Sequence, residues 1–178
     1  MPSPDASFRF ESERLVLRPF RLDDAESLHE LLDLDPDDPG MTLKERRAAV
    51  TYRVTQLDWD EGIGSYAVEE RASGRLVGYA GLQFHLLPMR PVATPELELF
   101  YGLGTAYRGM GYAREAAALL RDHAFATLQV GRLVSVTERA NQPSIRLLEQ
   151  LGAEIRDHPR RDDLVIGVID APSRAEAG

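Results

Sequence analysis

Residues 108–113 combine the side chains and the spacing of a site for an anion. They lie between an alternating stretch at 96–101 and apolar residues that recur at helical spacing from 113 onward. The first amides of a helix have no partner inside the helix, and the helix dipole attracts negative charge to them. Glycines let the backbone approach a phosphate closely. The turn therefore predicts a phosphate cradle, made of Arg108, Gly109, Met110, Gly111, Tyr112 and Ala113.

The turn does not have the sequence of the common nucleotide sites. No G-x-x-x-x-G-K-[ST] loop occurs in the chain, and Gly102-Leu103-Gly104 lacks the third glycine of a dinucleotide fingerprint. These differences argue against nucleotide hydrolysis and NAD binding. Because a glycine turn before a helix also serves structure alone in many proteins, the flanking sequence must decide its use.

The flanking sequence resembles the GNAT (GCN5-related N-acetyltransferase) superfamily. Arg108, Gly111 and Ala113 match its pyrophosphate motif, [QR]-x-x-G-x-[GA], at the strand-to-helix junction where the family has it. The stretches ELELFYGLGTAYRGMGYAREAAALL and VSVTERANQPSIRLLEQLGAEI are similar to the branch that contains the ribosomal-protein N-terminal (alanine/serine) acetyltransferases. The resemblance covers residues 11–170 and departs from the family pattern at Ala153, where an aromatic residue is usual. This departure leaves the acyl-chain preference open.

The resemblance implies an enzyme, an N-acetyltransferase that moves an acetyl group from acetyl-CoA to a primary amine by direct attack in a ternary complex. It places the CoA pyrophosphate on the 108–113 turn. It also implies that a backbone amide between residues 99 and 102 binds the thioester carbonyl as an oxyanion donor. The cofactor-binding residues that it implies outside the turn are Leu99, Phe100, Tyr101 and Asn141, the last as a partner of the pantetheine arm.

Glu98 and Ser144 are the catalytic residues that the resemblance implies. Glu98 stands where this branch commonly has a glutamate, and a carboxylate beside a cleft can take the amine proton directly or through water. Ser144 matches the serine that protonates the departing thiolate in members of the branch. Each residue has a simpler alternative. Glu98 can form a solvated pair with Glu96 on the same strand face, and Asn141 and Ser144, which flank Pro143, can be ordinary helix caps.

The sequence also leaves other functions and residue roles open. The chain could be a non-catalytic acyl-CoA binding or sensor module, or a structural module in which the glycine turn is only a turn. No metal site is expected, because the histidines show no ligand spacing such as H-E-x-x-H. Glu115 is expected to stabilise a helix N-terminus without a part in catalysis. Tyr52, Trp59, Phe84 and His85 could line an acceptor pocket, but packing in the core is favoured for most of them.

The elements that must position these residues alternate between strands and helices. Thr42 and Glu45 form a capping-box pattern at one helix start. Strands are expected at 14–18, 66–69, 76–84, 96–101, 133–137, 153–156 and 164–169, helices from 23–24, from 42 to 59, from 113 and from 141, and loops at 33–40 and 85–95. The fold class is α+β, a GNAT-like mixed, mostly antiparallel central sheet flanked by helices. One domain over residues 8–170 and flexible termini at 1–7 and 171–178 are expected.

Composition limits the partners. The chain has no cysteine, which excludes disulfides and cysteine nucleophiles, and it has neither a signal-peptide pattern nor an apolar run long enough to span a membrane. A cytoplasmic protein without membrane partners is therefore expected. Its formal charge of -8 argues against general nucleic-acid binding. The expected partners are acetyl-CoA and an amine acceptor, either a peptide or protein N-terminus or a small amine. A homodimer stays open, because relatives often dimerise.

Overall fold

A computed structural model describes residues 8–32, 40–55, 62–85 and 96–172. Within these residues the strands form one sheet, in the order β1-β2-β3-β4-β5-β6-β8-β7. Every neighbouring pair is antiparallel except β5 and β6, which confirms the predicted mixed, mostly antiparallel sheet. The strands are β1 Phe10–Glu11, β2 Leu15–Pro19, β3 Ser65–Glu70, β4 Leu76–His85, β5 Glu96–Leu103, β6 Arg132–Glu138, β7 Glu154–Asp157 and β8 Leu164–Asp170.

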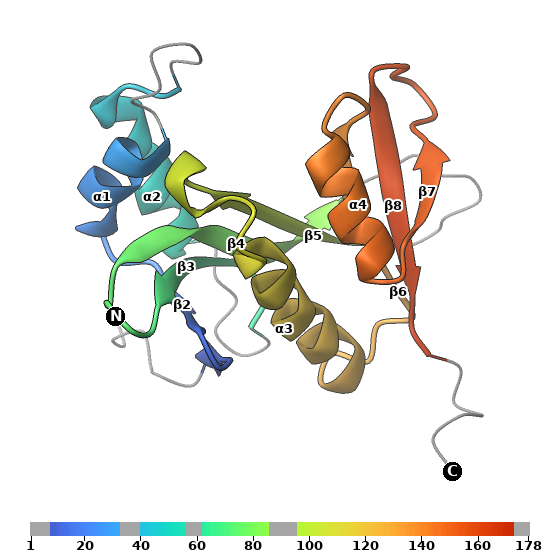
Figure 1. The fold of residues 1–178 in the computed structure, drawn as a ribbon, viewed down its shortest axis with the longest axis horizontal. Coiled ribbons are helices and arrows are strands. Elements are labelled where there is room, and N and C mark those ends of the chain that lie inside the picture. The colour runs from blue at the N-terminus through green and yellow to red at the C-terminus, as the bar shows by residue number, and fades with distance from the viewer. Residues whose placement is uncertain (1–7, 33–39, 56–61, 86–95, 173–178) are drawn as a thin grey trace.

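Helices cover both faces of this sheet (Figure 1). The first pair, α1 Asp24–Leu32 and α2 Leu43–Thr55, packs over Ala67 of β3. The second pair, α3 Tyr112–Ala126 and α4 Gln142–Gln150, packs over the opposite face, to which Tyr66 and Val68 point. A short 3₁₀ helix, η1 Thr105–Tyr107, precedes the glycine turn. None of the helices in the described part of the chain is long and apolar enough to cross a membrane.

Local signals in the sequence place several of these boundaries. At the start of α2 the Thr42 amide donates to Glu45 Oε2 at 2.9 Å and the Glu45 amide donates to Thr42 Oγ1 at 3.4 Å, as a capping box requires. Asn141 caps α4, and Gly152, with φ of 90°, follows its end. The predictions for residues 1–7, 33–39, 56–61, 86–95 and 173–178, which include Trp59, lie outside the described residues.

The pairing of β5 with β6 stops early, which the sequence did not predict. The two strands pair only at Leu97 with Leu133 and at Glu98 with Val134. On its other side β5 stays paired with β4 as far as Leu103. In Figure 1 the strands β6, β8 and β7 run in a direction different from that of β3 to β5. A split therefore opens in the sheet beyond Glu98, directly before the predicted phosphate turn.

A buried ion cluster fixes α1 to the sheet. Arg18 of β2 is 7% exposed and donates to both oxygens of Asp24, at 2.7 Å each, and to Glu69 Oε1 at 2.7 Å. Burial alone would lower the pKa of Arg18, but the two carboxylates outweigh that effect and raise it. The guanidinium therefore stays charged, and it compensates two carboxylates that the fold removes from water.

We expect Arg18→Met to lower the free energy of unfolding by about 3–5 kcal/mol, because the buried Asp24 would lose its counter-charge. Urea unfolding at neutral pH measures this loss. As the control, Arg161→Met removes an exposed pair with Asp163 and should leave the free energy of unfolding nearly unchanged. Equal losses in the two variants would show that burial adds nothing to the Arg18 cluster.

Candidate active site

The split exposes backbone groups of β5 in a defined order. The Gly104 amide donates to the Val77 carbonyl of β4 at 3.1 Å, and backbone groups alternate between the two sides of a strand. The groups of residues 99, 101 and 103 therefore point toward β6, while those of Phe100 point toward β4. Because a parallel pair at Glu98 engages the Leu99 amide, the first donor beyond the paired region is the Tyr101 amide. Of the predicted residues Leu99, Phe100 and Tyr101, Tyr101 thus presents the free amide to the split.

Beyond the split, the glycine turn adopts a conformation that needs glycine. Gly109 and Gly111 have φ of 76° and 80°, in the left-handed region. Gly111 is the N-cap of α3, whose first residue is Tyr112, so the turn leads directly into the helix start, where the first amides have no partner inside the helix. A Cβ on Gly109 would meet nothing within 4 Å. The cradle therefore fits a phosphate group in shape and in polarity.

Arg108 extends this cradle back to the split. Its Nε donates to the Leu103 carbonyl at 3.2 Å, one of the β5 groups that point toward β6. The residue as a whole is exposed, so its positive charge is accessible to an anion at the turn.

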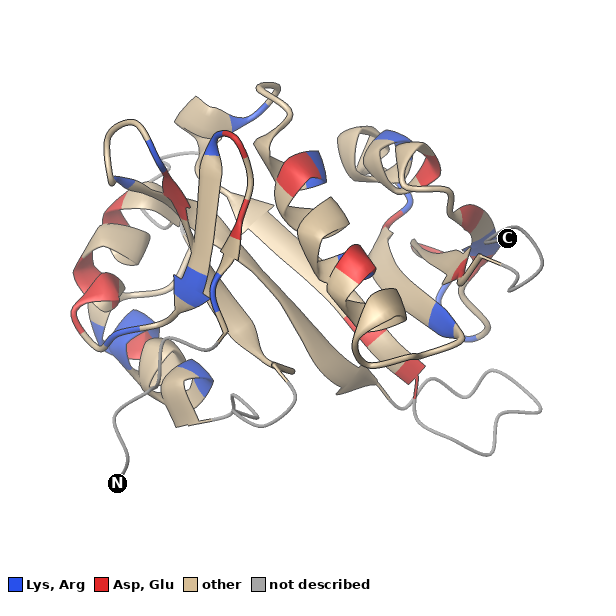
Figure 2. Ribbon diagram, turned by 90° about the horizontal axis from the view of Figure 1, so that it is seen from below, with Lys and Arg blue, Asp and Glu red and all other residues tan. Residues whose placement is uncertain are grey.

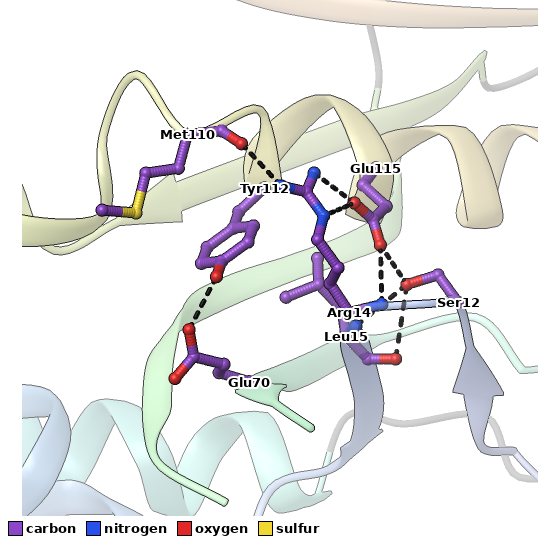
Figure 3. Close-up of polar contacts among 7 residues, drawn as sticks. All are labelled: Ser12, Arg14, Leu15, Glu70, Met110, Tyr112 and Glu115. Atoms are coloured by element: carbon purple, nitrogen blue, oxygen red, sulfur yellow. Dashed lines mark hydrogen bonds and ion pairs between the residues drawn. The ribbon is translucent and has the colours of Figure 1, made fainter. Parts of the chain in front are cut away.

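Arg14, which precedes β2, holds the glycine turn from behind (Figure 3). Its Nη1 donates to the Met110 carbonyl at 3.0 Å, its Nε donates to Glu115 Oε2 at 2.7 Å, and its guanidinium lies 4.8 Å from the centre of the Tyr112 ring. In a trans peptide the carbonyl and the following N–H point in opposite directions. With the Met110 carbonyl held by Arg14, the Gly111 amide is directed away from Arg14.

Glu115 and Tyr112 complete this support. Glu115 accepts hydrogen bonds from the Ser12 hydroxyl and from the Arg14 backbone and side chain, and the Tyr112 hydroxyl donates to Glu70 at 2.6 Å. Partial burial raises the pKa of Glu115, but the bonds from Ser12 and Arg14 outweigh it and the pKa is lowered. Glu115 is therefore a structural anion that orients Arg14, in addition to the expected stabilisation of the helix start.

A cavity of about 320 Å³ adjoins the turn between α3 and the end of α4. Its lining includes Gly111 of the turn and the arginines Arg14, Arg114 and Arg121. Across the ribbon as a whole, residues of both signs are interspersed, and the broad central strands are uncharged for most of their length (Figure 2). Glu115 also lines the cavity and pairs with Arg14, and Arg121 pairs with Asp122, so the positive charge of these arginines is partly compensated.

Tyr101 and Ser144 form a hydroxyl pair on the α3 side of the sheet. Tyr101 Oη and Ser144 Oγ are 2.9 Å apart. Asn141 behaves as the capping interpretation expects, since its Oδ1 accepts the Ser144 amide at 3.2 Å, but the Ser144 hydroxyl takes no part in this cap. Burial raises the pKa of Tyr101, and the bond with Ser144 only partly offsets this. The tyrosine therefore stays protonated at neutral pH and can donate a proton.

Glu98 lies on the opposite face of the sheet, where α1 and α2 pack. It is 6% exposed, and its Oε2 accepts hydrogen bonds from Gln83 Nε2 and from His85 Nδ1, both at 2.7 Å. Glu96 instead lies 3.6 Å from Arg132 Nη1 as an ion pair. The interpretation of Glu98 and Glu96 as a solvated pair is therefore wrong. The sequence offered His85 as a possible wall of the acceptor pocket but did not predict its bond with Glu98, which depends on the register of β4 against β5.

Two aromatic residues lie on the surface. Tyr52 of α2 is 64% exposed and Phe84 of β4 is 66% exposed, so the expectation of core packing was wrong for both. Phe84 neighbours Gln83 and His85 in β4, although alternation directs it to the other face. Among the described residues, no group of three or more metal-ligating side chains is arranged for a metal ion.

The family description that matches this chain is that of an acetyltransferase (GNAT) domain, over residues 14–154. The match spans well over half of the chain and includes Glu98, the glycine turn and Ser144. This chain belongs to the GNAT acetyltransferase family. The GNAT assignment makes it an acyltransferase enzyme and confirms the resemblance that the turn and its flanks indicated.

Similar proteins cover nearly all of this GNAT chain. The uncharacterized protein YkkB of Bacillus subtilis is 26% identical over 179 residues, 95% of this chain and 98% of its own. The uncharacterized N-acetyltransferase p20 of Bacillus licheniformis is 26% identical over 168 residues, 88% and 90% of the two chains.

Solved structures show the same architecture. A GNAT-family acetyltransferase from Bacillus anthracis has a TM-score of 0.73 at 20% identity, covering 91% of this chain and 98% of its own. The ribosomal-protein-S5-alanine acetyltransferase from Vibrio fischeri has a TM-score of 0.66 at 16% identity, with 93% and 97% covered. At these identities the likeness establishes the shared fold.

We expect Gly111→Ala to weaken CoA binding and to destabilise the chain by about 1–2 kcal/mol, because a Cβ is strained in the left-handed region. Its Cβ would also lie 3.4 Å from Arg14 Nη2. Calorimetric titration with CoA and thermal unfolding measure the two effects. The control is Gly131→Ala, where φ is not in that region and a Cβ meets nothing within 4 Å. Unchanged CoA affinity in Gly111→Ala would contradict the proposed cradle.

The lowered pKa of Glu115 makes its contribution to stability dependent on pH. A carboxylate with a lowered folded-state pKa stabilises the protein above its unfolded pKa, about 4.3, and loses that effect as pH falls through the folded value. Glu115→Gln should therefore melt below wild type at pH 7, and the difference should vanish under acid conditions. Glu149→Gln, at an exposed position of α4, is the control. A melting difference that persists unchanged into acid would contradict the charge-based role.

Proposed function

We propose that this GNAT enzyme transfers an acetyl group from acetyl-CoA to a primary amine, by direct attack within a ternary complex. The observation that carries the proposal is the split between β5 and β6. At this split, the hydroxyl pair of Tyr101 and Ser144 lies on one face of the sheet, and the buried Glu98 lies on the other face. A donor and an acceptor approaching from the two faces would meet at the split.

Donor binding would use the backbone more than side chains. The pyrophosphate would lie on the amides at the start of α3, with Arg108 beside it and Arg14 holding the turn. The neighbouring cavity, which is lined by Arg14, Arg114 and Arg121, would favour binding of the CoA phosphate that is not part of the pyrophosphate. Because the Tyr101 amide lies outside the β5–β6 ladder, it is the best-placed donor for the thioester carbonyl oxygen as negative charge develops there. Asn141, the N-cap of α4, would bond the pantetheine arm.

The two sets of polar side chains would divide the proton transfers. The Tyr101–Ser144 pair would protonate the departing thiolate, since both hydroxyls carry a proton at neutral pH and lie within hydrogen-bond distance of each other. Glu98 and its hydrogen-bond partners Gln83 and His85 would promote removal of the proton from the attacking amine. Such a division needs no covalent acyl-enzyme, and the chain has no cysteine to form one.

The acceptor is either a peptide or protein N-terminus or a small amine. The first option follows the name of the structurally similar Vibrio fischeri protein, a ribosomal-protein-S5-alanine acetyltransferase. A panel of N-terminal peptides, amino acids and polyamines, assayed for CoA thiol release from acetyl-CoA, separates these acceptors. Release above the hydrolysis background supports the proposal. CoA binding without release for any acceptor would instead identify a sensor, and absence of CoA binding would leave a structural module.

Ser144→Ala and Tyr101→Phe should each lower kcat by about 10²-fold or more, because each removes part of the proton donor. The KM for acetyl-CoA should change little in both variants. Steady-state kinetics with the best acceptor of the panel measures this, with Ser73→Ala in the exposed β3–β4 turn as the control. Full turnover in Ser144→Ala would mean that the residue serves only the start of α4.

A further inference from the structure

We infer that the atom that takes the amine proton is Nε2 of His85, and that Glu98 acts as the positioning residue that holds and charges this imidazole. The inference rests on the proposed acetyl transfer and reassigns the proton acceptor within it. Three features support it: the register of β4 and β5, the relative exposure of the two groups, and the hydrogen bonds that converge on one oxygen.

The register brings the two residues together from distant parts of the chain. Gln83 lies directly opposite Glu98, and His85 lies opposite Glu96. Alternation places the side chains of Gln83, His85 and Glu98 on one face of the sheet. Glu98 Oε2 accepts from Gln83 Nε2 and from His85 Nδ1, each at 2.7 Å. The Glu98 carboxylate is thus held by two donors of β4, the side-chain amide of Gln83 and the imidazole of His85.

Exposure separates the two titratable groups of this pair. The Glu98 side chain is 8% exposed, whereas that of His85 is 31% exposed. An acceptor amine approaching this face would therefore reach the imidazole more easily than the carboxylate.

The hydrogen bonds also decide the tautomer. A carboxylate accepts hydrogen bonds and donates none, so Nδ1 must carry the hydrogen that it shares with Glu98. The lone pair of a neutral His85 is then on Nε2. This arrangement, a carboxylate on one ring nitrogen and a free base on the other, is how an acid–histidine pair orients a general base and stabilises the imidazolium that forms.

Charged side chains of β5, β6 and α2 lie on this side of the sheet. Arg53 of α2 lies over the Phe100 ring of β5, 5.9 Å from its centre, and its Nη1 donates to Ser65 Oγ. Glu96 of β5 lies opposite His85 and forms an ion pair with Arg132 of β6, which also donates to Asp170 of β8 at 3.1 Å. Arg132 therefore has two acidic partners, Glu96 and Asp170. Among the described residues, Glu98 is the carboxylate that bonds the His85 ring.

The proton and electron balance of the transfer follows directly. The amine nitrogen forms a bond to the thioester carbonyl carbon, the carbon–sulfur bond breaks, and its electron pair leaves on sulfur. The nitrogen loses one proton to His85 Nε2, and the thiolate gains one from the Tyr101–Ser144 pair. Solvent exchange restores both groups, so no oxidant or further reactant is needed.

The test compares His85→Ala with Glu98→Gln in the thiol-release assay over a range of pH. We expect His85→Ala to lose about 10²–10⁴-fold in kcat at an unchanged KM for acetyl-CoA, and to lose the acidic limb of the wild-type pH profile. Added imidazole should restore part of the rate. His158→Ala, in the β7–β8 turn, is the matched control and should behave as wild type. If His85→Ala keeps most of its turnover while Glu98→Gln loses it, Glu98 is itself the base and the inference is wrong.

A second readout does not depend on turnover. Nitrogen NMR of the histidine side chains should show His85 as the Nδ1–H tautomer in wild type, with that preference lost in Glu98→Gln. An Nε2–H tautomer in wild type would overturn the inference. Failure of the proposed function is distinguishable, because wild type would then release no thiol with any amine. Failure of the inference alone leaves wild-type turnover intact.

Discussion

The early end of the β5–β6 pairing is the constraint on which the rest of this GNAT structure depends. Unpaired backbone groups inside a sheet are costly unless they find another partner, and β5 loses its β6 partner just after Glu98. Arg108 satisfies one such group, the Leu103 carbonyl. The remaining groups are available for an extended ligand that pairs with a strand edge. The pantetheine arm of CoA has the amides for such pairing.

The split also explains why the polar residues fall into two sets. Alternation along β5 sends Glu98 to one face of the sheet and Tyr101 to the other, so the Glu98–His85 pair and the proposed proton donor do not share one pocket. Each is then adjusted by its own neighbours. Burial keeps Tyr101 protonated, whereas Gln83 and His85 bond the buried Glu98. In the proposed reaction, the opening between β5 and β6 would let groups on the two faces of the sheet act on one reacting centre.

The phosphate turn depends on contacts that are remote in sequence. Its glycines supply the conformation, but the orientation of the Met110 peptide is set by Arg14 and, through Arg14, by Glu115. This places the start of β2 among the elements that build the site. It also concentrates positive charge near the turn on a chain of net charge -8, which keeps the anion site local.

Local patterns predicted the parts of this fold that depend on local physics. The capping box at Thr42, the cap at Asn141 and the junction before α3 rest on neighbouring residues, and the structure confirms them. Register and pairing order are set by contacts between distant segments. The split, the position of β8 between β6 and β7, and the meeting of His85 with Glu98 therefore had no signal in spacing. The predicted fold class needed only the order of elements, whereas the catalytic arrangement needed the register.

The most direct test of this account is a titration of the isotopically labelled enzyme with CoA, followed through its backbone amide NMR signals. The account predicts the largest shifts at the amides of Tyr101, Gly109 and Gly111, with smaller shifts along α3 and at the start of α4. Large shifts confined to other surfaces, with these three amides unmoved at saturating CoA, would contradict the claim that the split and the adjoining turn together form the donor site.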